Sequence, residues 1–125
     1  MTLEMEKRFL LLLSSYYCIT NSLPTTKQNV LDTIVENGWV DLNSIDLLAK
    51  HNRNELVWRN DFAFVRKHLA QEGFYLSAAR NDWSISNPAG KRELARLFTI
   101  ANSTESLQKI TALAVQYGRQ VFPFP

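Results

Sequence analysis

A few residues of this chain have side chains that could bind a metal ion or act as a nucleophile. Cys18, His51 and His68 could supply sulfur and nitrogen ligands to zinc, but they come from separate segments without the paired spacing usual at zinc sites. A Cys–His nucleophile needs the same residue types, yet Cys18 follows two tyrosines on a predicted helix, which favours an inert buried thiol. We therefore expect neither a metal site nor covalent catalysis.

Carboxylates and glycines give no stronger indication of catalysis. The aspartates that could pair for acid–base chemistry fall where capping, a turn or solvent exposure explains them: Asp41, Asp46, Asp61 and Asp82. The glycines are far apart, so the chain has no phosphate-cradling loop and no dinucleotide fingerprint, and it has no G-x-S-x-G motif. We expect no cofactor, no catalytic residue and no enzymatic activity.

One helical face has side chains typical of DNA recognition. On a helical wheel of residues 59–72, Phe62, Val65 and Leu69 gather on one arc. The opposite arc carries cations, amides and small residues, namely Arg59, Asn60, Ala63, Arg66, Lys67, Ala70 and Gln71. Arginine and amide side chains can pair with guanine and adenine in the major groove, and small residues let a helix approach the bases. An ordinary solvated helix displays similar residues, so both interpretations stay open.

Further cations follow this helix. Arg80 and Asn81 fall at the tip of a predicted turn, where a cation could contact the minor groove or a phosphate, and Lys91 and Arg92 come near a helix start. The predicted DNA-contacting residues are Arg59, Asn60, Ala63, Arg66, Lys67, Gln71, Arg80, Asn81, Lys91 and Arg92. Phe64 lies about 160° from Phe62 on the wheel, and we expect it to pack against a flanking helix.

Apolar spacing and capping residues predict the elements that would position these side chains. The predicted helices cover about residues 2–19, 25–37, 45–49, 59–72, 88–98 and 102–118. Gly38, Gly73 and Gly118 are expected to end three of them. Alternating apolar residues at 74–76 and 83–85, on either side of the turn-compatible "ARND", predict a short β-hairpin.

These elements predict a mainly α fold with a small β-hairpin. Three helices followed by a hairpin form the layout of a winged helix-turn-helix, which N- and C-terminal helices would flank. We divide the chain into an N-terminal helical arm (1–23), a winged-helix domain (24–99) and a C-terminal helix with a proline-containing tail (100–125).

Length and composition indicate one domain in a reducing compartment. The chain has 125 residues, of which 46% are hydrophobic, and its net charge of +2 is too small to prove a polyanionic partner. The lone Cys18 cannot form an internal disulfide. The apolar run at residues 9–13 is too short for a secretion signal or a membrane span, so we expect a cytoplasmic protein without a membrane segment.

The segment "NDFAFVRKHLAQEGFYLSAARNDWSISNPAGK" resembles the N-terminal winged-helix domain of Mrr-type modified-DNA restriction proteins. The matching positions are Phe64, Leu69, Gly73, Phe74, Arg80, Trp83, Ser86, Pro88 and Gly90. Two departures are Phe64 at a position where the family usually has tryptophan, and the extra residue Asn87. The resemblance implies DNA recognition in defence against foreign or modified DNA. The chain has no acidic-x-Lys nuclease signature, so the resemblance does not imply cleavage.

The leading functional hypothesis is a dimeric winged-helix protein that binds double-stranded DNA. Two apolar stripes outside the winged-helix segment suggest a homodimer through the flanking helices: Leu3, Leu10, Leu13 and Tyr17 in one, and Leu107, Ile110, Ala114 and Tyr117 in the other. The alternative is a non-enzymatic module for protein interaction or dimerisation, in which the winged-helix scaffold docks a nuclease or another defence subunit.

Overall fold

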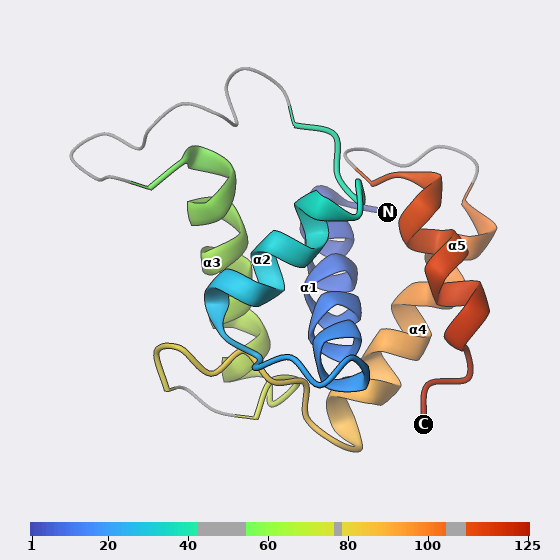
Figure 1. The fold of residues 1–125 in the computed structure, drawn as a ribbon. Helices are drawn as coiled ribbons and strands as arrows, with labels where there is room; N and C mark the ends of the chain where they lie inside the picture. Colours follow the sequence, from blue (N-terminus) through green and yellow to red (C-terminus); the bar gives the residue numbers. More distant parts are fainter. Residues whose placement is uncertain (43–54, 77–78, 105–109) are drawn as a thin grey trace.

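The computed structural model describes residues 1–42, 55–76, 79–104 and 110–125. Within these residues the chain is mainly helical (Figure 1). The helices are α1 (Leu3–Thr20), α2 (Lys27–Glu36), α3 (Val57–Gln71), α4 (Ala89–Ser103) and α5 (Ala112–Val121). The short helix predicted at residues 45–49 lies outside the described residues. No helix in the described ranges is long and apolar enough to cross a membrane.

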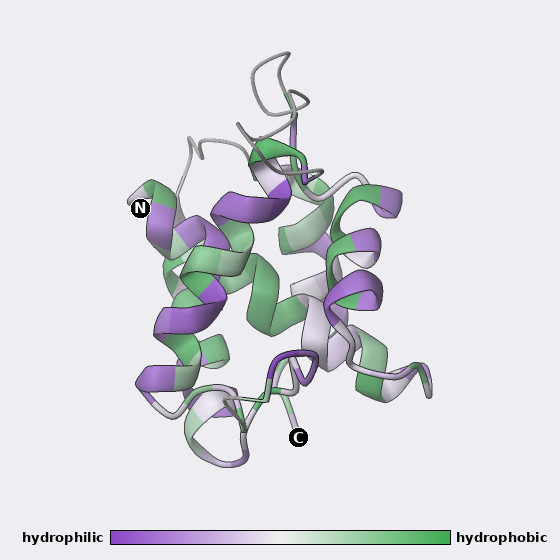
Figure 2. Ribbon diagram, turned by 90° about the vertical axis from the view of Figure 1, so that its left-hand side faces the viewer, coloured by the Kyte–Doolittle hydropathy of each residue, from purple (hydrophilic) through white to green (hydrophobic). Residues whose placement is uncertain are grey.

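Helix α1 lies at the centre of the core, whereas the sequence predicted a flanking arm. It packs against α2, α3 and α4, and α5 packs on α4 (Figure 1). Residues 9–13 are all buried, and five consecutive helical residues point to every side of the helix axis. Such a helix needs neighbours all round. The outer helices carry hydrophilic and hydrophobic residues on different sides of their circumference (Figure 2).

Local capping signals set most of the helix ends. The hydroxyls of Thr2 and Thr26 accept hydrogen bonds from the backbone N–H groups of the first turns of α1 and α2. After α2, Gly38 has a φ of 67° and the Trp39 N–H donates to the Ile34 carbonyl at 2.9 Å. This is the left-handed glycine ending that the sequence predicted, and Gly73 ends α3 in the same way, with a φ of 80°.

The β-hairpin predicted after α3 is wrong. In the described part of this segment there is no strand, and a single isolated antiparallel bridge joins Tyr75 to Ile85. The Leu76 N–H donates to the Ser84 carbonyl at 2.8 Å, beside that bridge. The winged-helix interpretation therefore has no strand pair to support it and stays a prediction.

The end of α3 limits the ladder on one side of the bridge. The Ser86 N–H donates to the Phe74 carbonyl at 2.9 Å, but the Phe74 N–H, which a longer ladder would pair with the Ser86 carbonyl, donates instead to the Leu69 carbonyl of α3 at 2.9 Å.

The opposite edge of residues 83–85 is bound to the helices. The Trp83 N–H donates to the Thr25 carbonyl at 2.8 Å, and the Ile85 N–H donates to the buried hydroxyl of Ser15 in α1, also at 2.8 Å. These two N–H groups point away from residues 74–76 and hold the segment against α1 and the connection between α1 and α2.

The C-terminal helices also differ from the prediction in their boundaries. Helix α4 runs to Ser103, beyond the predicted end near residue 98, and α5 begins at Ala112 instead of near residue 102. Thr104 is extended and separates the two helices. At Gly118 the ring of Phe98 lies so close that a Cβ atom there would meet two ring carbons at 2.6 Å. The prediction that Gly118 ends this helix is wrong, because α5 continues to Val121. A glycine at this position instead allows α5 to approach α4.

Candidate nucleic-acid interface

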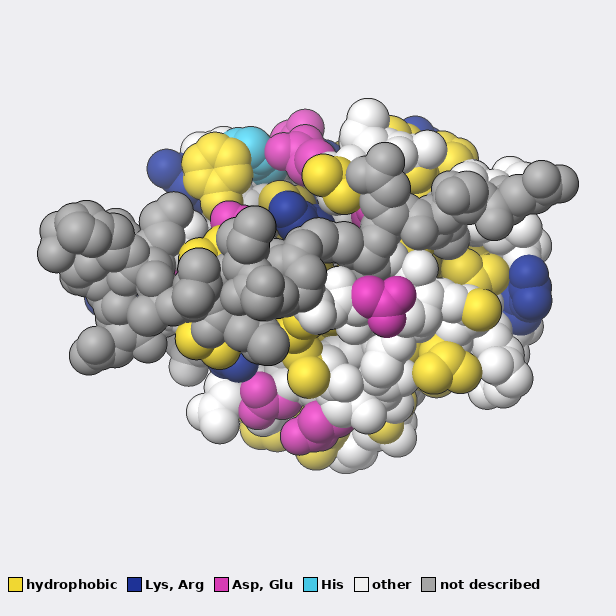
Figure 3. Space-filling view, turned by 90° about the horizontal axis from the view of Figure 1, so that it is seen from above, with side chains coloured by type: hydrophobic (Ala, Val, Ile, Leu, Met, Phe, Trp, Pro, Cys, Tyr) yellow, Lys and Arg dark blue, Asp and Glu magenta, His cyan; other side chains and the backbone are white. Residues whose placement is uncertain are grey.

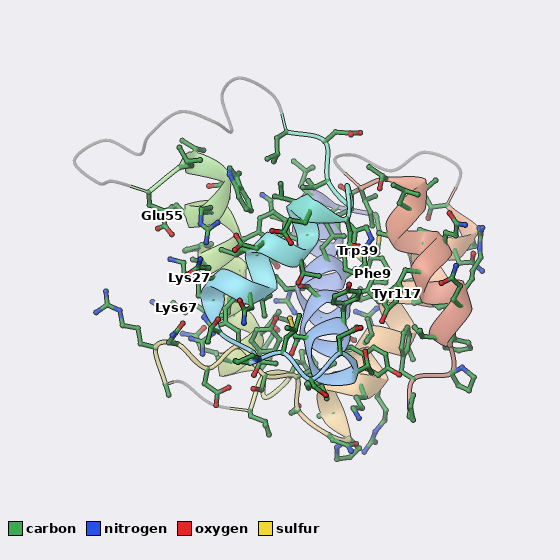
Figure 4. All side chains as sticks on the ribbon, viewed as in Figure 1. Phe9, Lys27, Trp39, Glu55, Lys67 and Tyr117 are labelled. Atoms are coloured by element: carbon green, nitrogen blue, oxygen red, sulfur yellow. The ribbon has the colours of Figure 1, made fainter. Side chains whose placement is uncertain are left out.

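Helix α3 has one face in the core and one face turned away from α1. Its inward side chains are Trp58, Phe62, Val65 and Leu69, all of them buried. The residues on the opposite face are Asn60, Phe64, Lys67 and Gln71, which follow one another at helical spacing. We call these four residues the outward stripe. Lys67 is exposed and points away from α1 (Figure 4).

Phe64 is exposed, against the expectation that it packs on a flanking helix. Its relative exposure is 60%, and its ring makes an edge-on contact with His68 at 4.7 Å between ring centroids. The expectation failed because neither flanking helix covers Phe64: α1 packs on the inner side of α3 and only borders a hollow that Phe64 lines, and α5 packs on α4. The position of Phe64 on the wheel, among polar residues and opposite Phe62, is the signal that indicated exposure.

A charged network joins the outward side of α3 to the first turns of α1. The His68 Nδ1 lies 2.9 Å from Glu4 Oε1, and Arg8 Nε donates to Glu4 Oε2 at 3.3 Å. Arg8 also pairs with Glu72 at the end of α3. Partial burial opposes ionisation of Glu4, but the His68 hydrogen bond and the Arg8 guanidinium outweigh it and lower the pKa of this carboxyl group. Figure 3 shows the histidine between an exposed hydrophobic group and an acidic group.

Arg66, a predicted base-contacting residue, is part of the folded framework. Only 9% of its surface is exposed, and its Nη2 donates to the carbonyls of Ala79 and Asp82 at 2.9 and 2.7 Å. Its guanidinium carbon lies 5.7 Å from the centre of the Trp83 ring. The prediction is wrong for this residue because Arg66 holds the turn at residues 79–82 against α3.

The turn at residues 79–82 carries two more predicted contact residues. Asn81 is exposed, but its Oδ1 accepts a hydrogen bond from the backbone N–H of Lys27 at 3.0 Å and so helps cap α2. Arg80 is exposed at the tip of the same turn. Arg66 joins this turn to α3, so Arg80 is exposed on a segment that is fixed to the helix carrying the outward stripe.

The predicted DNA-contacting residues near the start of α3 are less accessible to a ligand than Lys67 or Gln71. Arg59 pairs with Asp32 of α2 at 3.3 Å, and its guanidinium lies 5.2 Å from the centre of the Trp58 ring. Ala63 is partly buried and packs on the core. Asn60 is half-buried and lines a hollow that the first turns of α1 complete. Of these three residues, Asn60 alone belongs to the outward stripe.

Lys91 and Arg92 lie elsewhere in the molecule. Both line a hollow formed with residues 122–125, and the Lys91 Nζ donates to the Pro125 carbonyl oxygen at 2.6 Å. The C-terminus lies across α1 from α3 (Figure 1). The ten predicted residues therefore do not form one surface. Lys67 and Gln71 are exposed on α3 and Arg80 is exposed on the turn that Arg66 binds, whereas Lys91 and Arg92 lie apart from them, beside the C-terminus.

Cys18 and His68, two of the three candidate zinc ligands, lie in the described ranges. There, no group of three or more His, Cys, Asp or Glu side chains could hold a metal ion. Cys18 is buried, and burial raises the pKa of its thiol, although a contact with the Thr33 hydroxyl at 3.6 Å opposes that rise. His51 and Asp46 lie outside the described residues.

Comparison of the chain with protein-family models, with curated proteins and with solved structures finds no match. The functional argument therefore depends on the residues of this chain and on the resemblance of its residues 60–91 to a winged-helix segment.

Proposed function

We propose that the chain is a non-enzymatic module that binds double-stranded DNA through the outward stripe of α3 and Arg80. The observation that carries this proposal is the pair of hydrogen bonds by which Arg66 fixes the turn at residues 79–82 to α3. Arg80 is exposed on this turn, and Lys67 is exposed on α3. Lys67 and Arg80 can contact phosphates. The amide side chains of Asn60 and Gln71 lie on the same face of α3 as Lys67 and can pair with bases.

The charge balance around this surface supports the proposal. Three nearby acidic side chains are paired with two arginines: Glu4 and Glu72 share Arg8, and Asp32 pairs with Arg59. Asp61 and Lys7 line the same hollow as Asn60 and Phe64, and their charges are opposite. Pairing reduces the repulsion that free carboxylates would exert on phosphates. The resemblance to Mrr-type winged-helix domains extends the proposal to DNA recognition in a defence system, with cleavage supplied by a separate nuclease subunit.

The test is fluorescence anisotropy of the chain with labelled DNA duplexes over a series of salt concentrations. We expect log K to fall linearly with log salt, with a slope of about 0.9 per phosphate neutralised. The Lys67→Gln/Arg80→Gln variant should reduce that slope by about two. The matched control is Arg92→Gln/Arg119→Gln, which removes the same charge across α1 from α3. Equal losses in both variants would contradict the proposed surface.

The exposed apolar side chains beside this surface favour a second candidate function, a protein-interaction module. Phe64 and Leu76 have relative exposures of 60% and 65%. Large apolar groups in contact with water often mark protein interfaces. Failure of the wild-type chain to bind any duplex at low salt would exclude the DNA-binding proposal and favour this alternative.

A further inference from the structure

Phe64 is a large apolar side chain in the middle of a polar stripe. It lies one helical turn after Asn60 and about one turn before Lys67, and more than half of its surface is exposed. Burying an aromatic ring against a ligand gives more binding energy than most contacts of its size. The Phe64 ring therefore indicates that a ligand of the outward stripe has an apolar group.

The Phe64 ring contacts a charged network at the surface. It lies edge-on to the His68 ring, with 4.7 Å between ring centroids, and His68 is itself hydrogen-bonded to Glu4 of α1, which also binds Arg8. The contact with His68 restricts the orientations open to the Phe64 ring. A ring that is already positioned loses little conformational entropy when it binds, which makes it suitable for a specific contact.

We propose that Phe64 packs on the C5-methyl group of thymine in the major groove, so that the chain prefers A·T-containing DNA. This inference rests on the proposed DNA-binding function. In unmodified DNA, the thymine methyl is the apolar group on the major-groove edges of the bases, and Asn and Gln side chains pair with adenine there. Asn60 and Gln71 lie on the same stripe as Phe64.

The spacing of the stripe is close to the rise between base pairs two steps apart. A helix rises about 1.5 Å per residue, so Asn60 and Phe64 are separated by about 6 Å along the axis. Two base-pair steps of DNA rise by about 7 Å. Lys67 and Arg80 add the positive charge that a DNA duplex requires of its partner, which favours this occupant over an apolar protein surface.

The experiment uses three duplexes that share length and label: an A·T-rich duplex, the same duplex with uracil in place of thymine, and a G·C-rich duplex. Uracil lacks only the methyl group. We expect the wild-type chain to bind the uracil duplex about fourfold more weakly for each methyl group in contact, and to bind the G·C-rich duplex more weakly than the thymine duplex. Phe64→Ala should bind the thymine and uracil duplexes equally.

The control is Leu113→Ala, which removes an exposed apolar side chain of α5 and should retain the wild-type preference for thymine. Circular dichroism of each variant verifies that it is folded, and Phe64→Leu should keep part of the preference. Salt-dependent binding with equal affinity for thymine and uracil would overturn this inference and leave the proposed function standing. Absence of binding to any duplex would overturn both.

Discussion

Arg66 shows how a side chain suited to base recognition can instead serve the fold. Its guanidinium satisfies two backbone carbonyls, at Ala79 and Asp82, and lies over the Trp83 ring. A planar group with several donors is well suited to this role, because one side chain can bind two acceptors of a turn. Arg66 therefore contributes to any DNA contact by positioning Arg80.

We expect the Arg66→Met variant to be destabilised by about 2 kcal/mol, because two carbonyls lose a charged hydrogen-bond donor. Chemical denaturation of the variant and the wild type measures the change. The neighbouring substitution Lys67→Gln, at an exposed position, should change the free energy of unfolding by less than about 0.5 kcal/mol. Similar effects at the two positions would contradict the structural role of Arg66.

Glu4 gives a prediction for the dependence of stability on pH. Its pKa is lower in the folded chain than in the unfolded chain, so its ionised form stabilises the fold above its ordinary pKa. This stabilisation is lost as the pH falls through the lowered folded pKa. The Glu4→Gln variant should be less stable than the wild type by about 0.5 kcal/mol near neutral pH, because the network is largely exposed.

The difference between Glu4→Gln and the wild type should shrink towards zero at about pH 3, where both carry a neutral side chain at this position. Urea denaturation at both pH values tests this expectation. Glu36→Gln is the control, since Glu36 is exposed at the end of α2 and is not a member of the network with His68 and Arg8. A constant difference across the pH range would show that Glu4 acts through packing instead of charge.

Among the helices, α1 contributes most to the core. A helix with buried residues on every side needs neighbours all round, and α2, α3 and α4 pack against α1. The described part of the segment between α3 and α4 also fits closely against its neighbours. One such fit is at the start of α4, where Gly90 is buried against the chain that follows α3. A Cβ atom on Gly90 would lie 2.2 Å from the Phe74 carbonyl oxygen.

Gly90→Ala should therefore destabilise the chain by about 3 kcal/mol, even though alanine favours a helix more than glycine does. Gly118→Ala should cost less, because the added methyl group meets the ring of Phe98, which can rotate, whereas the Phe74 carbonyl is fixed by the backbone. Thermal unfolding of both variants tests this order. A larger loss of stability in Gly118→Ala would mean that the contact at Phe98 is the more rigid one.

In the molecule as a whole, internal packing takes up the apolar stripes that suggested a dimer. Leu10 and Leu13 of α1 and Ala114 of α5 are buried within the chain, and Tyr17 and Tyr117 contact each other with 5.4 Å between ring centroids. Leu3 is 43% exposed and Leu107 lies outside the described residues, so the homodimer stays a prediction, which the burial of the other stripe members weakens.

We expect light scattering at micromolar concentration to give the mass of one chain, 14.4 kDa. Because Leu10 and Leu13 of α1 are buried within the chain, the apolar stripe of this helix has little exposed surface left to drive association. The Tyr117→Ala variant removes the ring that contacts Tyr17 of α1. We expect it to have a lower free energy of unfolding than the wild type, with the same mass by light scattering under native conditions. A measured mass of two chains for the wild type would show that other exposed apolar residues, such as Ile19 and Leu23, form an interface.

The helices could be predicted from the sequence because their signals are local. The threonine caps of α1 and α2 and the glycines that end α2 and α3 act on backbone groups within a few residues, so these boundaries follow from short stretches of chain. The same periodicity also identified the inward residues of α3 correctly. Periodicity within one helix says nothing about which neighbour covers it, and so α1 was wrongly expected to flank the fold.

The availability of each polar side chain depends on partners that are distant in sequence. Arg66 binds a turn more than ten residues away, Asn81 caps a helix 54 positions earlier, and Glu4 reaches His68 across 64 positions. Such contacts occupy polar groups that the sequence pattern assigned to a ligand. Phe64, by contrast, has most of its surface exposed. Composition and spacing therefore determined which residues face outward from α3, while long-range packing decided which of them can bind a ligand, because desolvation and hydrogen bonding act in three dimensions.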